Sequence, residues 1–213
     1  MIIGIDEAGK GPIIGSMFVA GIYAKFDDIL YLKKLNIKDS KKLSDKKRKE
    51  IYKKIISKIK DYYILEIKAC VIDELRKIMT MNQIMNICYF KVIKNLYHLE
   101  SNVIIVDACD VYENRFKENI LNYLKRENMN PFILSKHKAD EKYLIVSAAS
   151  ILAKVCRDNM IEKLKIENNF DFGSGYPSDK KTINFLKKYN FSNLNFNRNI
   201  RFSWKTIDNL RKC

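Results

Sequence analysis

The sequence predicts an α/β fold in one main domain with a small appended segment. Strand-like and helix-like apolar patterns alternate along the 213-residue chain, and this alternation is typical of a sheet covered by helices. The hydrophobic content of 47% is enough for one sizeable core. Glycine occurs only in two stretches, residues 4–21 and 173–175. Because glycine is used where the backbone needs a positive φ or a close approach, we expect two special loops that meet in space.

The strands are predicted from short apolar runs. Five runs are of this kind: 2–6, 17–24, 62–68, 103–106 and 132–134. A Gly/Pro turn joins the first two. The run at 103–106 is the most apolar and ends in Asp107, so it indicates a buried central strand with a carboxylate at its end.

The helices are predicted from apolar spacing and from N-cap residues. Ser44 is a good N-cap for a lysine-rich helix between the second and third strands. Apolar residues then recur at helical spacing from Ile72 and again from Ile84. Further helices are expected at about 112–126, at about 142–165, and in a lysine-rich stretch after Gly175 that leads into an Asn-rich tail.

The charge of the chain points to a polyanionic partner. Forty Lys and Arg against 25 Asp and Glu give a net charge of +15. Residues 33–61 hold thirteen cationic and four acidic residues, a net of +9, and residues 180–213 hold nine and one, a net of +8. The basicity therefore belongs to two patches, which favours nucleic acid over an anionic membrane. For any single lysine, a solvated face is the simpler explanation.

Secretion and membrane insertion are not expected. No uncharged apolar run approaches the roughly 20 residues that a spanning helix needs, and acidic residues stand at positions 6 and 7, where a signal peptide would be apolar. The five cysteines form no CxxC pair, so neither a disulfide framework nor a zinc site is indicated. We expect buried thiols in a cytoplasmic protein.

One motif resembles a phosphate-binding P-loop but fails as one. Residues 4–11 fit GxxxxGK after a strand, yet Gly11 stands where the motif needs Ser or Thr for Mg²⁺, and Pro12 follows it. Asp6 and Glu7 would also place two carboxylates in an anion cradle. The P-loop reading is therefore disfavoured.

The same acidic residues make better sense as metal ligands. Asp6 and Glu7 end an apolar strand, Asp107 ends another, and Asp140 could join them from a helix start. Carboxylates grouped in this way need cations in order to stay ionised. Each acid alone could instead cap a helix or sit in a turn, but these roles do not explain an acidic pair at the end of an apolar strand.

Seven ordered blocks resemble the ribonuclease HII family, the type 2 ribonucleases H, and are closest to its archaeal members. The blocks are GIDEAGKGP (4–12), DSKKLS (39–44), VDACD (106–110), KHKAD (136–140), SAASILAKVCRD (147–158), GSGYPSD (173–179) and SWKT (203–206). The resemblance implies a ribonuclease H-like α/β fold with a mixed central sheet and a small helical C-terminal segment. It divides the chain into a catalytic core at 1–172 and a substrate-binding loop and helical segment at 173–213.

The resemblance also implies an activity. Family members are endonucleases that hydrolyse the RNA strand of RNA/DNA hybrids and cut 5′ to a ribonucleotide embedded in duplex DNA, leaving 3′-hydroxyl and 5′-phosphate ends. Their four catalytic carboxylates correspond to Asp6, Glu7, Asp107 and Asp140, which would hold two Mg²⁺ or Mn²⁺ ions. By family likeness the protein is expected to be a monomer. No C-terminal sliding-clamp motif is evident, so clamp binding is not predicted.

The resemblance assigns substrate contacts as well. The glycine turn that reads the 2′-hydroxyl corresponds to Gly9, Lys10 and Gly11. Lys10 stands in place of the usual arginine and lacks the planar fork for bidentate contact to phosphate, whereas backbone readout should survive. The tyrosine that stacks on the sugar corresponds to Tyr176. Further candidates for contacts to the duplex are Ser40, Lys41, Lys42, Asn82 and Lys138, followed by Arg157 and Lys205.

A basic binding module without catalysis is the competing hypothesis. Composition does not separate it from a nuclease. The four predicted carboxylates do separate the two hypotheses, because a pure polyanion binder would lose affinity through repulsion from carboxylates at its binding face.

Overall fold

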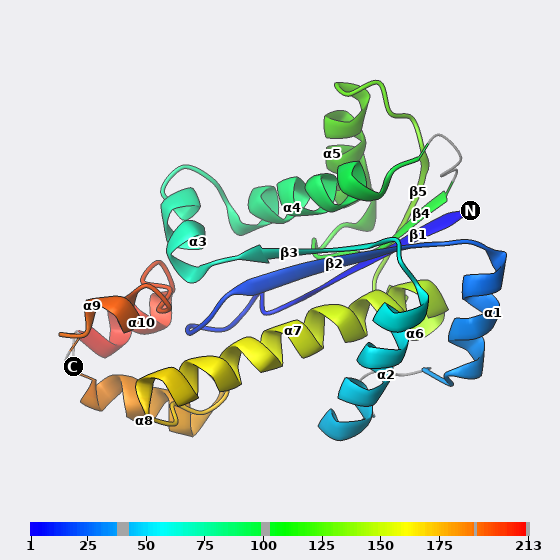
Figure 1. Ribbon diagram of the computed structural model, residues 1–213. Coiled ribbons are helices and arrows are strands. Elements are labelled where there is room, and N and C mark those ends of the chain that lie inside the picture. Colours follow the sequence, from blue (N-terminus) through cyan, green and yellow to red (C-terminus); the bar gives the residue numbers. More distant parts are fainter. Residues whose placement is uncertain (38–42, 99–102, 190, 212–213) are drawn as a thin grey trace. The chain divides into compact units, whose positions relative to one another are not determined.

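The structure is a computed structural model that describes residues 1–37, 43–98, 103–189 and 191–211 (Figure 1). Its sheet has the strand order β3-β2-β1-β4-β5. The strands are β1 (Ile2–Ala8), β2 (Met17–Ala24), β3 (Tyr62–Ile67), β4 (Val103–Asp107) and β5 (Phe132–Lys136). β4 pairs in parallel with both β1 and β5, whereas eight residues between β1 and β2 are too few for a parallel crossover. The predicted α/β fold with a mixed sheet is confirmed.

The helices follow the predicted pattern with two differences. They are α1 (Phe26–Lys34), α2 (Asp45–Lys58), α3 (Ala69–Arg76), α4 (Met81–Leu96), α5 (Glu113–Lys125), α6 (Ala139–Lys142), α7 (Leu144–Asn168), α8 (Lys180–Lys188), α9 (Leu194–Asn197) and α10 (Lys205–Arg211). Ser44 caps α2 as predicted, since its hydroxyl accepts from the Lys47 amide at 3.3 Å. The helix predicted at about 142–165 is confirmed as α7, but the short helix α6 before it was not predicted, and the extended Tyr143 separates the two. The sequence reasoning did not anticipate α1.

Two glycines let helices approach the sheet closely. A Cβ added at Gly4 would lie 2.6 Å from the Ile145 backbone on α7, and one at Gly21 would lie 2.5 Å from Val92 on α4. In Figure 1, α4 and α5 cover one face of the sheet and the first half of α7 covers the other. The central strand β1 is therefore buried on both faces, and Ile3 and Ile5 have no exposed surface.

The chain forms two compact units. Unit 1 comprises Met1–Ala8, Val19–Leu65 and Met81–Val155, and unit 2 comprises Gly9–Phe18, Glu66–Thr80 and Cys156–Cys213. Unit 2 has a core of its own that is rich in aromatic rings, among them Phe172 and Phe196, whose centroids lie 5.6 Å apart. The boundary that the sequence suggested at residues 172 and 173 stays a prediction.

The two glycine stretches meet inside unit 2, as the sequence predicted. The Gly175 carbonyl accepts from the amides of Ile13, at 2.7 Å, and Ile14, at 3.2 Å. Gly175 has a φ of +82°, and a Cβ on it would lie 2.7 Å from the Ile14 carbonyl oxygen. The position therefore requires glycine, both for its backbone conformation and for space.

The cysteine prediction was correct for pairing and wrong for burial. The four cysteines in the described ranges are free, but only Cys88 is buried, while Cys70, Cys109 and Cys156 are partly exposed.

Within the described residues, no helix combines the length and the apolar character needed to cross a membrane.

Candidate active site

Three carboxylates lie together at one edge of unit 1. Asp6 and Glu7 belong to β1, and Asp107 ends the neighbouring parallel strand β4. Ile5 pairs with Val106, so Asp6 and Asp107 follow at the same level of adjacent strands. Parallel strands carry their carboxyl ends to the same edge, which is why two separate apolar runs bring their acidic residues together.

The electrostatics of this edge disfavour two ionised carboxylates side by side. Burial raises the pKa of Asp6 well above its usual range, and the neighbouring Asp107 and Glu7 raise it further. Asp6 has only 4% of its surface exposed. The Glu7 amide donates to its Oδ1 at 2.7 Å, and Ser150 also donates to the carboxylate, but these bonds lower the pKa by less than burial raises it. A cation would stabilise the ionised form here.

The residue before Asp140 connects it to this edge, because the backbone amide of Ala139 binds Asp107. The Ala139 amide donates to Asp107 Oδ1 at 2.7 Å, and Asp140 follows on the short helix α6 with 4% of its surface exposed. Lys154 Nζ is 3.8 Å from Asp140 Oδ2. Lys138, a predicted substrate contact, adopts a left-handed φ of +55° just before α6 and is exposed.

The donor set fits hard divalent cations, although its geometry is not preset. All four side chains offer carboxylate oxygens, the ligands that Mg²⁺ and Mn²⁺ prefer. In the part of the chain that the structure describes, no three His, Cys, Asp or Glu side chains are already arranged to hold a metal ion.

One residue that the sequence reasoning missed, Tyr89, supports this edge from α4. The Tyr89 hydroxyl donates to the Asp107 carbonyl oxygen at 3.1 Å and lies 3.2 Å from Cys109 Sγ. Burial raises the pKa of Tyr89 well above its usual range, so it stays a neutral donor. The apolar spacing of α4 marks Tyr89 as a core position, but nothing in the pattern reveals its polar contact.

The structure describes some, but not all, of the other residues that the sequence predicted to contact the substrate. Asn82 opens α4, and its Nδ2 donates to the buried carboxylate of Asp110 at 3.3 Å. Arg115 also binds Asp110 and lowers the pKa of that carboxyl. Ser40, Lys41 and Lys42 lie outside the described residues.

Unit 2 holds the predicted glycine turn and tyrosine. Gly9 has a φ of +88°, and a Cβ on it would lie 2.9 Å from the Ser16 carbonyl oxygen, so this position requires glycine. A Cβ on Gly11 would meet only the Tyr176 ring, at 3.8 Å, which is an ordinary contact. Gly11 is exposed and Lys10 is partly exposed. The Arg157 guanidinium lies 4.8 Å from the centroid of the Tyr176 ring and also donates to the Ser174 carbonyl oxygen.

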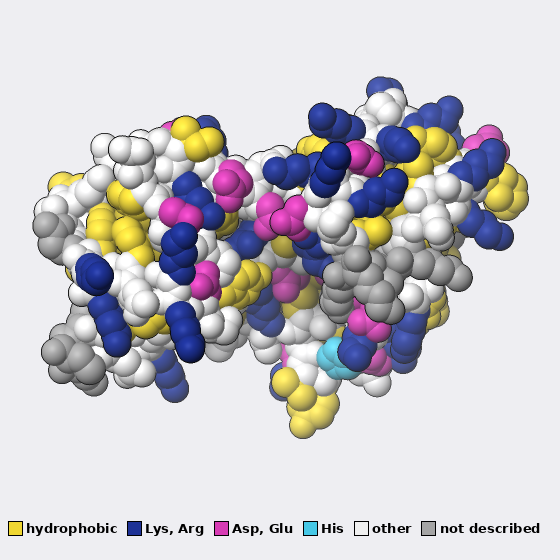
Figure 2. Space-filling view, turned by 90° about the horizontal axis from the view of Figure 1, so that it is seen from below, with side chains coloured by type: hydrophobic (Ala, Val, Ile, Leu, Met, Phe, Trp, Pro, Cys, Tyr) yellow, Lys and Arg dark blue, Asp and Glu magenta, His cyan; other side chains and the backbone are white. Residues whose placement is uncertain are grey.

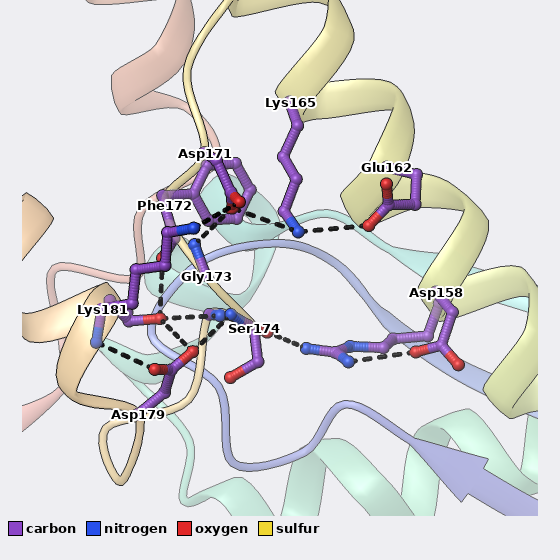
Figure 3. A network of polar contacts seen from close by, with 12 residues as sticks. Asp158, Glu162, Lys165, Asp171, Phe172, Gly173, Ser174, Asp179 and Lys181 are labelled. Carbon is purple, nitrogen blue, oxygen red and sulfur yellow. Dashed lines mark hydrogen bonds and ion pairs between the residues drawn. The ribbon is translucent and has the colours of Figure 1, made fainter. Parts of the chain in front are cut away.

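A polar network fixes the loop that carries Tyr176 (Figure 3). The Ser174 amide donates to Asp179 Oδ2 at 2.6 Å, and the Gly175 amide donates to Thr182 Oγ1 at 2.9 Å. On the other side, Lys181 reaches Asp171 Oδ2 at 2.5 Å. The loop is therefore held at its base before any ligand binds.

Asp179 makes this network sensitive to acid. The Ser174 amide lowers the pKa of Asp179 to about 2, so its stabilising effect is present above pH 4 and is lost as the pH falls toward 2. We expect Asp179→Asn to lower the free energy of unfolding at pH 7 by about 1 kcal/mol, because the side chain is partly exposed. The loss should shrink as the pH falls below 4.

The fluorescence of Trp204, the only tryptophan, reports unfolding of unit 2 in urea at pH 7, 5 and 3. Glu167→Gln is the control, since Glu167 is exposed and pairs with Lys163 at 3.6 Å on the same helix. An Asp179→Asn loss that does not change with pH would contradict the electrostatic explanation.

Basic side chains are spread over the face of the molecule that Figure 2 shows. Figure 2 shows Lys and Arg spread over one face, with acidic side chains scattered among them. The exposed lysines of α2 are Lys46, Lys47, Lys49, Lys53, Lys54 and Lys58. Because Ile51 and Ile55 are buried on the opposite side of α2, this helix presents a cationic face to solvent, as nucleic-acid binding requires.

Comparison with known proteins identifies close relatives. The family model for Ribonuclease HII matches residues 3–207. Ribonuclease HII of Methanosarcina acetivorans is 46% identical over 217 residues, which cover 100% of this chain and 96% of the relative. The crystal structure of ribonuclease H2 from Pyrococcus horikoshii OT3 matches with a TM-score of 0.88 at 36% identity, covering 99% of this chain and 97% of that one. A structure of the PCNA:RNase HII complex from Archaeoglobus fulgidus matches with a TM-score of 0.83 at 40% identity, again covering 99% and 97%.

Proposed function

This chain belongs to the ribonuclease HII family and is a ribonuclease H hydrolase, and from that premise we propose that it cuts the RNA strand of RNA/DNA hybrids and the 5′ side of ribonucleotides embedded in duplex DNA. The observation that carries the proposal is the acidic edge, where Asp6, Glu7 and Asp107 lie together on strands β1 and β4. A pure nucleic-acid binder gains nothing from buried carboxylates that repel phosphate.

The reaction would be hydrolysis of a phosphodiester. The oxygen of a water molecule bonds to phosphorus, the bond from phosphorus to the 3′ oxygen breaks, and the 3′ oxygen takes up a proton. The products are a 3′-hydroxyl and a 5′-phosphate. The ribonuclease H family depends on divalent metal ions. Asp6, Glu7, Asp107 and Asp140 would hold two Mg²⁺ or Mn²⁺ ions, and such ions would serve to activate the water molecule and to stabilise the leaving oxygen.

Recognition of the substrate would fall to unit 2 and to basic side chains. Gly9, Lys10 and Gly11 would present backbone groups to the 2′-hydroxyl, the group that distinguishes RNA from DNA. Tyr176 would stack on the sugar next to the ribonucleotide. Asn82 and Lys138, together with Ser40, Lys41 and Lys42 in the segment outside the described residues, would contact phosphates of the duplex.

The test compares three labelled duplexes with Mg²⁺ and with Mn²⁺. One contains a single ribonucleotide in DNA, one is an RNA/DNA hybrid and one is all DNA. We expect cutting of the first two, with the first cut only at the 5′ side of the ribonucleotide, and no cutting of the all-DNA duplex or in EDTA.

Variants connect this activity to the acidic edge. Asp107→Asn should abolish cutting, whereas Asp61→Asn, an exposed aspartate just before β3, should leave it unchanged. If neither ribonucleotide-containing duplex is cut although both are bound, the nuclease proposal is wrong and the basic binding module replaces it. If the hybrid is cut but the single ribonucleotide is not, only the junction recognition is wrong.

That this chain does not bind a sliding clamp stays a prediction. One relative was solved in a complex with PCNA, whereas the C-terminal sequence of this chain gave no clamp motif. The monomeric state expected from the family is a prediction of the same kind.

A further inference from the structure

A buried arginine of the C-terminal segment binds the carbonyl groups of the glycine turn. Arg201 has no exposed surface. Its Nη2 donates to the Gly9 carbonyl oxygen at 2.7 Å, its Nη1 to that of Lys10 at 2.9 Å, and its Nε and Nη2 to that of Gly15 at 3.0 and 2.9 Å. All three guanidinium nitrogens are thus used on one loop, and the planar fork sets the relative positions of three carbonyl groups.

Trp204 binds the next carbonyl group of the same turn. Its indole Nε1 donates to the Gly11 carbonyl oxygen at 3.2 Å, and the Arg201 guanidinium lies 5.0 Å from the centroid of its ring. The two side chains support each other through this cation–π contact. Together they bind three consecutive carbonyl groups, those of Gly9, Lys10 and Gly11.

These contacts orient the amide groups of the turn. In a planar trans peptide the carbonyl and the following N–H point in opposite directions, and no peptide bond among the described residues is cis. Because the carbonyls of Gly9 and Lys10 point to Arg201, the N–H groups of Lys10 and Gly11 point away from it. The Gly11 carbonyl is followed by Pro12, which has no N–H. The turn therefore presents two adjacent N–H donors on the side opposite Arg201.

The segment that carries Arg201 is itself fixed in place. The Arg201 amide donates to the Ile13 carbonyl oxygen at 2.7 Å, and the Gly15 amide donates to that of Asn199 at 2.7 Å. Asp73 accepts from the amides of Phe202, at 2.7 Å, and Ser203, at 3.0 Å. The guanidinium is therefore held in position before substrate arrives, which lowers the entropy cost of an oriented turn.

We propose that Arg201 and Trp204 are positioning residues for ribonucleotide recognition, which they serve by holding the Lys10 and Gly11 amides toward a 2′-hydroxyl. This role deepens the proposed function and rests on it. It also accounts for the lysine at position 10, because the turn is shaped through its backbone and the side chain at that position is not needed for the amides to be oriented.

Two substitutions test the proposal against a matched control. Arg201→Lys keeps the charge but replaces the planar fork with one nitrogen, and Trp204→Phe keeps an aromatic ring beside Arg201 but removes the donation to Gly11. Arg198→Lys is the control, since Arg198 is an exposed arginine of the same segment. We expect Arg201→Lys to lower kcat/KM on the single-ribonucleotide duplex about 10²-fold, Trp204→Phe to lower it less, and Arg198→Lys to leave it unchanged.

A binding measurement separates positioning from a general structural role. In the Asp107→Asn background, Arg201→Lys should lower affinity for the ribonucleotide duplex and leave affinity for the matching all-DNA duplex unchanged. Equal losses on both duplexes, or no loss on either, would overturn the proposal.

Amide hydrogen exchange of the free protein gives a readout that does not depend on the reaction. Arg201→Lys should speed exchange at residues 9–15 and leave that of β1 and β4 as in the wild type. Unchanged exchange at residues 9–15 overturns the proposal. If the wild-type protein cuts none of the duplexes, the proposed function fails and the role in recognition fails with it, while the exchange result still decides whether Arg201 orders the turn.

Discussion

Replacing Asp6 with asparagine is expected to lower cleavage by at least about 10²- to 10³-fold and, at the same time, to stabilise the metal-free protein. Both effects have one origin. Asp6 is buried beside Asp107 and Glu7, and burial followed by these two charges raises its pKa well above the usual range. The fold therefore disfavours the ionised form that a metal-dependent reaction needs, and removing the charge removes that cost.

The pH dependence gives the sign of the stability effect. An acid whose pKa is raised on folding lowers stability as the pH rises from its ordinary pKa toward its folded value. In EDTA, Asp6→Asn should match the wild type near pH 3.5 and unfold at a higher temperature at pH 7. A gain of about 1 kcal/mol corresponds to a rise in Tm of about 2–4 °C in a chain of this length. Adding Mg²⁺ or Mn²⁺ should then raise the Tm of the wild type more than that of the variant.

Asp110→Asn is the control for this argument. Asp110 is a buried carboxylate three residues after Asp107, but its bond to Arg115 lowers its pKa. Its replacement should therefore lower stability at pH 7, the opposite sign to Asp6→Asn. If both variants lose stability to the same extent, the acidic edge is an ordinary structural feature, and the metal argument that starts from it is wrong.

The acidic edge was predictable from the sequence because it depends on strand ends. Apolar runs that stop at Asp6 and at Asp107 mark where each strand changes from apolar to acidic residues, and parallel pairing then brings these residues to one edge. The two glycine stretches were predictable for a similar reason, since Gly9 and Gly175 adopt positive φ angles that few other residues accept. In both cases a local chemical constraint appears directly in the residue type.

The contacts of Arg201 and Tyr89 were not predictable in this way. Arg201 is one of nine cationic residues in the stretch 180–213, and sequence pattern does not distinguish a buried guanidinium from a solvated one. Its role depends on carbonyl groups nearly two hundred residues earlier. Tyr89 looks like any aromatic residue on the apolar side of a helix, and its bond to the Asp107 carbonyl appears only when α4 is placed against the sheet.

The helix errors have physical causes of the same kind. α1 (Phe26–Lys34) has only nine residues, buries a single one, Leu32, and exposes 75% of Phe26, so a segment this short gives a weak signal for a helix packed on the core. The break between α6 and α7 at Tyr143 follows a left-handed Lys138. No glycine or proline marks that bend, and the alanine-rich sequence that follows favours a longer helix.

Replacing Tyr176 with alanine is expected to have the second largest effect, and one that depends on the substrate. Stacking between an aromatic side chain and a nucleotide is worth about 1–3 kcal/mol, so cleavage at a single embedded ribonucleotide should fall by about 10- to 100-fold. A long hybrid offers many equivalent sites along the RNA strand, and its cleavage should fall less. Tyr176→Phe keeps the ring and should retain most of the activity on both duplexes.

The Tyr176→Ala variant can be compared directly with the wild type, because the contacts that hold the loop do not involve the Tyr176 ring. The Ser174 and Gly175 amides are bound by Asp179 and Thr182, so Tyr176→Ala should leave the loop in place. The ring does contact Arg157, whose guanidinium lies 4.8 Å from its centroid, and Trp204 fluorescence in urea checks that unit 2 keeps its stability. Equal losses on the two duplexes, or a Tyr176→Phe variant as impaired as Tyr176→Ala, would show that the ring does not select the ribonucleotide junction. A loss confined to the single ribonucleotide, with stability intact, would mean that stacking by Tyr176 selects the site of cutting while the carboxylates of unit 1 supply the chemistry.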